Sequence, residues 1–295
     1  MLTALPALGG VSGELSGPGG HSRAPASETA STGQPGGSNG QGQSDPDGSD
    51  WVTYPPGERS ELEVSLALWR RFLGVDAAEV QEVIGFVRGR PWVGYARSFD
   101  EQLRLLRRAQ DQRGFAGAYL LCNPIDSRIA ERYEPGDFGP ATAGRASDKE
   151  ITSRRAVFID IDPVRPKGIS ATAEEREAAF SVAHQVRVLL DSRCGKPAVG
   201  WGSSGNGFYL VIAIEPVAVC PEQGRRIKRL LDGLQSRFGT AAASIDGTVY
   251  NPARLMPAPG TWKRKGAGSK ERPHRITSFC CSYTAPSPVP LEVLA

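Results

Sequence analysis

The sequence predicts an α+β fold, because helix and strand patterns are both present and do not alternate regularly. Apolar residues recur on one face of the segment 221–238, as in an amphipathic helix. Three short apolar segments, 118–122, 157–161 and 208–214, are bounded by glycine, proline or polar residues, which is typical of strands. A chain of βα units would alternate the two kinds of element. We therefore expect an α+β domain over residues 56–285.

The first 55 residues differ in composition from the rest of the chain. Residues 1–50 contain 12 Gly, 8 Ser and 5 Pro, with almost no large apolar side chains. Such a segment buries too little apolar surface to offset the entropy lost on ordering it. We expect a disordered tail over residues 1–55, and we treat residues 286–295 as a C-terminal extension of the domain.

Composition also indicates a location and a kind of partner. The sequence has no run of about 18 apolar residues and no basic-then-apolar N-terminal segment, so neither a membrane span nor a secretory signal is expected. The five cysteines are odd in number and lack metal-ligand spacing, which favours the reducing cytoplasm. The net charge is +3, but residues 1–55 carry −4, which leaves +7 for the rest. That excess suits a partner that carries phosphates.

Capping residues and apolar spacing predict the remaining elements. Ser98, followed three residues later by Glu101, forms a capping-box pattern that predicts a helix start. The polar segment 126–150 is long for a loop, so we expect it to have a functional role or to be mobile. The other expected elements are helices over 60–73 and 77–87, a helix that begins at Ser170 with Ala179, Val182, Val186 and Leu189 on one face, and a hairpin around residues 202–207.

The strand at 157–161 carries a pair of aspartates. Side chains alternate along a strand, so Asp160 and Asp162 share one face with Phe158, while the aliphatic side chains take the other. Same-face residues lie roughly 6.5 Å apart, close enough for both carboxylates to bind one ion. Two anions so placed repel, and hard cations such as Mg²⁺ favour carboxylate oxygens. The pattern therefore indicates a metal site.

Two further patterns indicate phosphate binding. Ser203-Ser-Gly-Asn-Gly207 lies between two expected strands, where glycines allow a ligand to approach the backbone and hydroxyl and N–H groups can hold phosphate oxygens. Residues 254–275 contain seven basic residues and one acid, a net of +6, which favours a phosphate-binding groove.

In their order, these motifs resemble the archaeo-eukaryotic primase superfamily, above all the primase-polymerases of phages, plasmids and integrated elements. The resemblance covers roughly residues 90–278. The motifs that carry it are Asn123-Pro124 after a strand, Asp160 with Ile161-Asp-Pro-Val-Arg-Pro-Lys-Gly168, Ser204-Gly-Asn-Gly207, Ser244-Ile-Asp246, Asn251-Pro-Ala-Arg254, Pro259-Gly-Thr-Trp-Lys-Arg-Lys265 and Arg272-Pro-His-Arg275.

The resemblance implies a primase-polymerase core, an RRM-like mixed sheet flanked by helices. It implies a catalytic, metal-binding set for Mg²⁺ or Mn²⁺ composed of Asp160, Asp162 and Asp246. It implies nucleotide contacts from Ser204, Gly205, Asn206, Gly207, Tyr209, Arg165 and Arg254. It implies nucleic-acid contacts from Lys263, Arg264, Lys265, Arg272 and His274. One position departs from the pattern: the family's second motif ends in histidine, and Tyr209 brings no positive charge at neutral pH.

The implied activity is template-dependent nucleotidyl transfer by two metal ions, in replication of a mobile element, phage or plasmid. Its expected partners are a single-stranded DNA template and nucleoside triphosphates. A helicase would act in trans, because the sequence contains no Walker A motif. Two alternatives stay open: a primase-like domain that binds nucleotide or nucleic acid with little catalysis, since Tyr209 replaces histidine, and a phosphatase, since Asp160-Ile-Asp-Pro-Val164 fits DxDx[TV].

Overall fold

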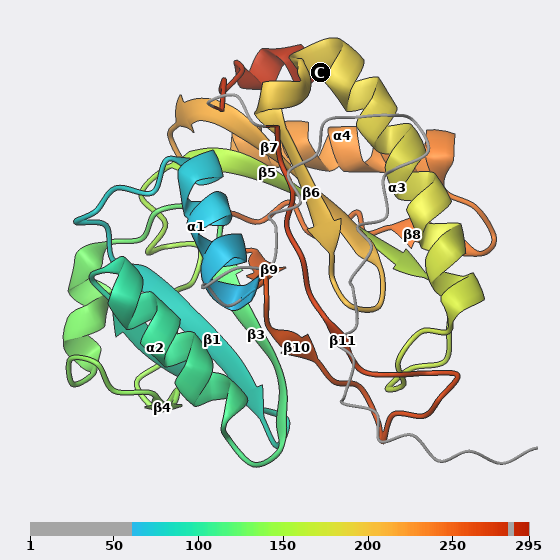
Figure 1. The fold of residues 1–295 in the computed structure, drawn as a ribbon. Coiled ribbons are helices and arrows are strands. Elements are labelled where there is room, and N and C mark those ends of the chain that lie inside the picture. Colours follow the sequence, from blue (N-terminus) through green and yellow to red (C-terminus); the bar gives the residue numbers. More distant parts are fainter. Residues whose placement is uncertain (1–60, 283–285, 295) are drawn as a thin grey trace, which may run out of the picture. The chain divides into compact units, whose positions relative to one another are not determined.

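The computed structural model of the protein describes residues 61–282 and 286–294. The expected disordered tail, residues 1–55, lies outside the described residues. Helices flank two antiparallel sheets, so the expected α+β class is confirmed (Figure 1). Nine of the described strands are divided between two main sheets, and two more form a separate two-stranded sheet. The named pairings among the described residues are all antiparallel, whereas one mixed sheet was expected.

Eighteen short and long elements make up the described chain. The α-helices are α1 (Glu61–Leu73), α2 (Phe99–Gln110), α3 (Ala173–Cys194) and α4 (Pro221–Phe238). The 3₁₀ helices are η1 (Ser127–Arg132), η2 (Lys196–Ala198) and η3 (Leu291–Leu294). The strands are β1 (Gln81–Val87), β2 (Arg90–Ala96), β3 (Phe115–Leu121), β4 (Gly139–Pro140), β5 (Arg154–Pro163), β6 (Val199–Ser203), β7 (Phe208–Val217), β8 (Ala243–Ile245), β9 (Leu255–Pro257), β10 (Trp262–Lys263) and β11 (Arg275–Ile276).

The expected helix over residues 77–87 is wrong, since this segment forms strand β1. Val80, Val83, Ile84 and Val87 recur at the spacing of a helix face, which explains the error. The strand is instead buried on both faces, where β-branched side chains pack well. It continues into β2 through a two-residue turn with φ of +49° at Arg88 and +74° at Gly89, the geometry of a tight hairpin.

The first sheet has the strand order β4-β2-β1-β3-β9. Helix α2 packs on one of its faces, and its N-terminus is capped as predicted, with the Ser98 hydroxyl accepting from the Glu101 amide at 3.2 Å. The other face carries a second core cluster, which includes Ile84 of β1 and Ile129 of η1. The segment 126–150 is mostly irregular, as expected, apart from η1 and β4.

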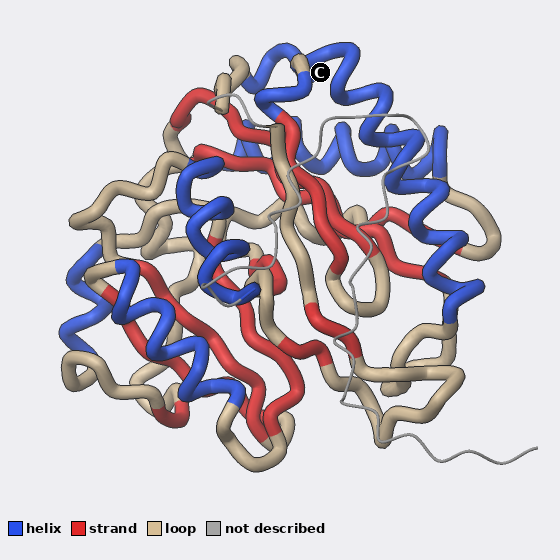
Figure 2. Tube along the Cα trace, in the orientation of Figure 1, coloured by secondary structure: helices blue, strands red, loops and turns tan. Residues whose placement is uncertain are grey.

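The second sheet has the order β6-β7-β5-β8. Helices α3 and α4 pack beside it (Figure 2). Helix α3 begins just after Ser170, and its capping box is formed by Thr172 and Glu175. Ala179, Val182 and Val186 of the predicted stripe are buried in the main core, with Leu189 packed against it.

The C-terminal part of the chain returns across both sheets. Trp201 on β6 exchanges backbone hydrogen bonds with Cys280 at 2.9 and 2.8 Å, and β7 bonds to Val289. Leu291 and Leu294 of η3 are buried in the main core, so residues 286–294 pack on this domain. Helix α1, expected over 60–73, joins the same core. No helix in the described ranges is long and apolar enough to cross a membrane.

Candidate active site

Strand β5 carries the aspartate pair at a point where it is paired with a strand on each side. It lies between β7 and β8, with Asp160 opposite Tyr209 and Asp162 opposite Ser244. Ile159 and Ile161 are fully buried on the alternate face, as the period of a strand requires. This packing fixes the strand, so the two carboxylates share a face and keep their spacing.

The carboxylates face a cavity of about 320 Å³ that both sheets line. The second sheet and its loops contribute Asp160, Asp162 and Arg165. The first sheet contributes the rings of Phe86 and Tyr119, whose centroids lie 5.5 Å apart at an interplanar angle of 85°. The remaining lining residues are Arg145, Ser204, Asn206, Asn251, Ala253, Arg254, Leu255, Pro257, Lys263 and Lys265.

The cavity is strongly cationic around its two acids. Five basic side chains line it against two carboxylates: Arg145, Arg165, Arg254, Lys263 and Lys265. Such an excess of positive charge in a concave site suits a ligand with several negative charges.

Burial and neighbouring charges shift the pKa values of these groups. Burial raises the pKa of Asp160, and the negative charge of Asp162 raises it further. Burial lowers the pKa of Lys263 to about 7, with a smaller contribution from Lys265. Burial also lowers the pKa of Lys265, and the positive charge of Arg165 adds to this effect. In the ligand-free cavity, the charged forms of all three groups are therefore less stable than they would be in water.

The glycine-containing turn lies against the aspartate strand. A Cβ at Gly207 would overlap the backbone carbonyl of Ile161, so only glycine allows this approach. The amide of Gly207 donates to the Ser204 hydroxyl at 2.9 Å, and the amide of Gly205 donates to the Ser203 hydroxyl at 3.1 Å. These N–H groups are thus already bonded within the turn. The contribution of the turn to the cavity lining comes from Ser204 and Asn206.

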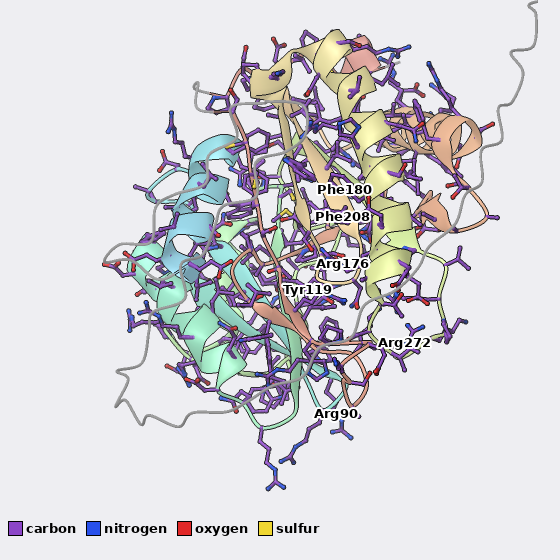
Figure 3. The ribbon with its side chains drawn as sticks, turned by 45° about the vertical axis from the view of Figure 1, so that its right-hand side comes forward. Arg90, Tyr119, Arg176, Phe180, Phe208 and Arg272 are labelled. Carbon is purple, nitrogen blue, oxygen red and sulfur yellow. The ribbon has the colours of Figure 1, made fainter. Side chains whose placement is uncertain are left out.

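Aromatic side chains support this hairpin from the α3 side. Phe208 packs edge-on against Phe180 at 5.3 Å, and the Arg176 guanidinium lies 5.1 Å from the Phe208 centroid (Figure 3). Arg176 also donates to the Ser203 hydroxyl at 3.1 Å. These contacts fix the turn relative to α3.

Residues 251–254 form a further wall, held by two polar side chains. The Asn123 amide donates to the Pro252 carbonyl at 2.9 Å, and its oxygen accepts from the backbone of β5 at 3.0 Å. Asp148 accepts from Asn251 and from the Ala253 amide at 3.1 and 2.9 Å. The Asn123-Pro124 and Asn251-Pro252 motifs therefore tie the first sheet to the aspartate strand.

Asp246 lies beside the pair, but its carboxylate is engaged elsewhere. Its amide donates to the Asp160 carbonyl at 2.9 Å. One of its carboxylate oxygens accepts from the amide and the hydroxyl of Thr248, and the other faces Arg254 at 3.3 Å. Metal binding by Asp246 stays a prediction.

The donor set fits a divalent cation bound by two carboxylates. Asp160 and Asp162 face one cavity, and their mutual repulsion would be relieved by a cation, with phosphate oxygens completing its coordination. Within residues 61–282 and 286–294, no group of three or more His, Cys, Asp or Glu side chains is arranged to hold a metal. The arrangement therefore fits a site that substrate completes rather than a cage made by protein alone.

Of the fifteen residues expected in the site, eight line the cavity. They are Asp160, Asp162, Arg165, Ser204, Asn206, Arg254, Lys263 and Lys265. Gly205 and Gly207 belong to the same turn but are not among the lining residues, and a Cβ at Gly205 would overlap the Lys263 side chain.

The other expected residues make structural contacts outside the cavity lining. Tyr209 is buried, and its hydroxyl donates to the Ser278 carbonyl at 2.7 Å, although it lies opposite Asp160. Arg272 forms a bidentate pair with Glu175, both contacts at 2.7 Å, at the start of α3. Arg264 lies over the rings of Phe115 and Trp262, and His274 contacts the Gly266 carbonyl at 3.1 Å.

Sequence reasoning assigned no site role to seven lining residues: Phe86, Tyr119, Arg145, Asn251, Ala253, Leu255 and Pro257. The last four lie within or just after the Asn251-Pro-Ala-Arg254 motif. Phe86 was placed on a helix that does not exist, and Tyr119 belonged to an expected strand without an assigned role. Arg145 lies in the segment 126–150, whose unusual length was the one signal that pointed to it.

The comparisons with known proteins give one distant similarity. No protein-family model matches the sequence, and no curated protein matches it. Among solved structures, the chain is similar to the AEP domain of the cyanophage S-2L primase-polymerase, with a TM-score of 0.44 and 17% identity. The alignment covers 78% of this chain and 95% of that domain.

Proposed function

We propose that this protein is a template-dependent nucleotidyltransferase, a DNA primase-polymerase. The observation that carries the proposal is the cavity itself. It combines the Asp160–Asp162 pair with five cations and two aromatic rings, all contributed by well-separated parts of the sequence. Carboxylates for a divalent cation, cations for phosphates and rings for a base are the groups that nucleotide polymerisation needs.

The side chains of this chain would bind and orient the reactants. Arg254 and Lys265 act electrostatically on Asp160, so they are placed to bind phosphates next to the carboxylates. Phe86 and Tyr119 offer aromatic surface on which a base can pack, beside the Lys263 ammonium over the Tyr119 ring. Bound Mg²⁺ or Mn²⁺ would activate the attacking 3′-hydroxyl and neutralise charge on the phosphates. Catalysis would then come chiefly from positioning and charge.

A direct test is extension of a labelled primer on a single-stranded DNA template with Mg²⁺ or Mn²⁺. The proposal predicts products whose length follows the template and whose formation stops when EDTA is added. Parallel reactions with ribo- and deoxynucleotides would define the preferred sugar. Absence of any product under all of these conditions contradicts the proposed activity.

The second candidate is a domain that binds nucleotide without turnover. It is favoured by Tyr209, whose hydroxyl is bonded to Ser278 where the family pattern has histidine. Isothermal titration with a nucleoside triphosphate and Mg²⁺ separates the two functions, because binding without extension would select this candidate. The DxDx[TV] phosphatase has less support, since Asp246, the acid next to the pair, faces Arg254. Release of phosphate from p-nitrophenyl phosphate would favour it.

A further inference from the structure

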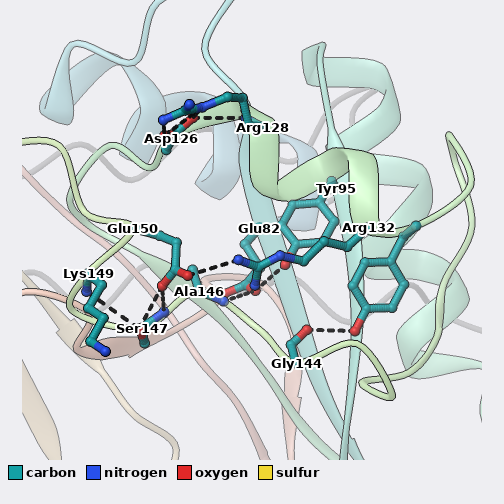
Figure 4. Close-up of polar contacts among 11 residues, drawn as sticks. Glu82, Tyr95, Asp126, Arg128, Arg132, Gly144, Ala146, Ser147, Lys149 and Glu150 are labelled. Atoms are coloured by element: carbon teal, nitrogen blue, oxygen red, sulfur yellow. Dashed lines mark hydrogen bonds and ion pairs between the residues drawn. The ribbon is translucent and has the colours of Figure 1, made fainter.

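The segment between β3 and β5 is irregular, yet side-chain hydrogen bonds fix it closely (Figure 4). Glu150 accepts from the amide and the hydroxyl of Ser147 at 3.0 and 2.6 Å, and from Arg132 at 3.0 Å. Asp126 caps η1 by accepting from the amide of Arg128 at 3.0 Å. The segment therefore has a defined conformation despite its lack of regular structure.

Arg145 lies between two anchored neighbours in this segment. On one side, the Tyr133 hydroxyl donates to the Gly144 carbonyl at 2.6 Å. On the other, the amide of Ala146 donates to Glu82 at 2.7 Å, and Ala146 is almost fully buried. Glu82 is held in turn by the Tyr95 hydroxyl at 2.7 Å. Ala146 is thus bonded to β1 of the first sheet, and Gly144 is bonded to Tyr133, whose ring lies 5.6 Å from that of Tyr95 on β2.

The guanidinium of Arg145 lines the cavity without a partner. Its Nη1 atom is buried and makes no hydrogen bond, and Arg145 forms no ion pair with another described residue. Burial raises the pKa of Glu82, and the positive charge of Arg145 partly offsets this increase. The hydrogen bonds that Glu82 accepts nevertheless come from Ala146 and Tyr95. A buried guanidinium donor without an acceptor is costly, which indicates that a ligand supplies the acceptor.

Arg145 serves a different part of the cavity from the cations near the carboxylates. Arg165 lies 3.9 Å from the Asp162 carboxylate, and Arg254 lies 3.3 Å from Asp246, whose amide donates to the Asp160 carbonyl. Arg145 instead adjoins Ala146, which is buried in the core cluster against which Phe86 and Tyr119 pack. An anion held by Arg145 is therefore separate from the one next to the aspartates.

We propose that Arg145 forms a second phosphate-binding subsite, on the aromatic wall of the cavity. The inference rests on the proposed nucleotidyl-transfer function of the same cavity. Its ligand is a phosphate group of either the nucleoside triphosphate or the backbone of a bound DNA strand. A guanidinium matches a phosphate with two parallel N–H donors, which lysine does not offer.

The test measures two kinds of binding with Arg145→Gln and Arg145→Lys. Isothermal titration measures nucleoside triphosphate with Mg²⁺, and anisotropy measures a labelled single-stranded oligonucleotide at several salt concentrations. Arg128→Gln is the matched control, since Arg128 lies in the same segment but is exposed and pairs with Asp126. We expect Arg145→Gln to weaken one of the two ligands by about tenfold or more, with a smaller loss for Arg145→Lys and none for the control.

The affected ligand identifies the source of the phosphate. If it is the DNA backbone, the slope of log affinity against log salt should also fall by about 0.7 for Arg145→Gln. Thermal unfolding provides the second readout, and Arg145→Gln should be at least as stable as the wild type. Unchanged affinity for both ligands overturns the inference, and so does a clear loss of stability, because Arg145 would then serve only to balance Glu82. A wild type that binds neither ligand overturns the proposed function as well.

Discussion

Lys263 is expected to weaken the fold while it strengthens ligand binding. Its ammonium lies 4.3 Å from the centroid of Tyr119, and its stem packs against Gly117 and Gly205. Burial lowers its pKa from 10.5 to about 7. Lys263→Met removes the charge but keeps an unbranched apolar stem of similar length, so it isolates the contribution of the charge.

The magnitude follows from the difference between the two pKa values of Lys263. One pKa unit corresponds to about 1.4 kcal/mol, so a fall from 10.5 to about 7 sets an upper limit of about 5 kcal/mol. The side chain is only half-buried, so solvent screens part of this cost. The lost contact with Tyr119 removes about 0.5–2 kcal/mol from the gain. We expect Lys263→Met to be more stable than the wild type by about 2 kcal/mol at pH 6.

The pH dependence of stability is an independent check that the charge of Lys263 destabilises the folded state. Because the folded state holds the proton of Lys263 less tightly than the unfolded state, the cost is fully present below pH 7. It disappears as the pH rises toward 10.5. Urea unfolding at pH 6 and pH 10 should therefore show a large gain for Lys263→Met at pH 6 and little at pH 10.

Binding and a matched control complete the experiment. Lys263→Met should bind single-stranded DNA more weakly, with a less steep dependence on salt. Lys270→Met removes an exposed lysine of the same basic segment and should leave stability unchanged. A Lys263→Met protein that is less stable than the wild type at pH 6, or equally stabilised at both pH values, would refute the reasoning.

Three further predictions concern the neighbouring residues. Tyr209→Phe removes the hydrogen bond to Ser278 and should lower the free energy of unfolding in urea by about 0.5–1.5 kcal/mol. Nucleotide affinity measured by titration should stay unchanged, and a loss of affinity would show that the hydroxyl reaches the ligand. Gly207→Ala should lower the same free energy by about 1–3 kcal/mol, since its Cβ would overlap the Ile161 carbonyl, and an unchanged midpoint would contradict that packing. Mg²⁺ at about 100 times its Kd should stabilise the wild type by about 2.7 kcal/mol in thermal unfolding and should have little effect on Asp160→Asn. An equal effect on both proteins would show that the ion binds elsewhere.

Local signals in the sequence predicted the elements that carry the carboxylates. The apolar alternation around Asp160 and the glycines of residues 204–207 fix which side chains share a face, and this geometry depends only on neighbours in the chain. The same holds for helix α4, whose predicted span of 221–238 agrees with the structure.

The rest of the site depends on contacts between distant segments. Arg272 and Lys265 look alike in a basic run, yet Glu175 engages the first while the second lines the cavity. The spacing of apolar residues led to the wrong assignment of β1 as a helix. The strand is buried on both faces, so its apolar residues also fall at the spacing of a helix face. Arg145 became visible only through the anchoring of its neighbours by Glu82 and Tyr133.

The most direct test of the central claim compares primer extension by the wild type with extension by Asp160→Asn and Asp162→Asn. Each substitution keeps the shape of the side chain and removes one charge from the cavity. Asp126→Asn, which alters the half-buried carboxylate that caps η1 outside the cavity lining, is the control. We expect template-dependent products with the wild type and the control, and none above background with either site variant. All four proteins should show the same cooperative unfolding. Equal extension by the wild type and both site variants would contradict the assignment of this carboxylate pair to catalysis.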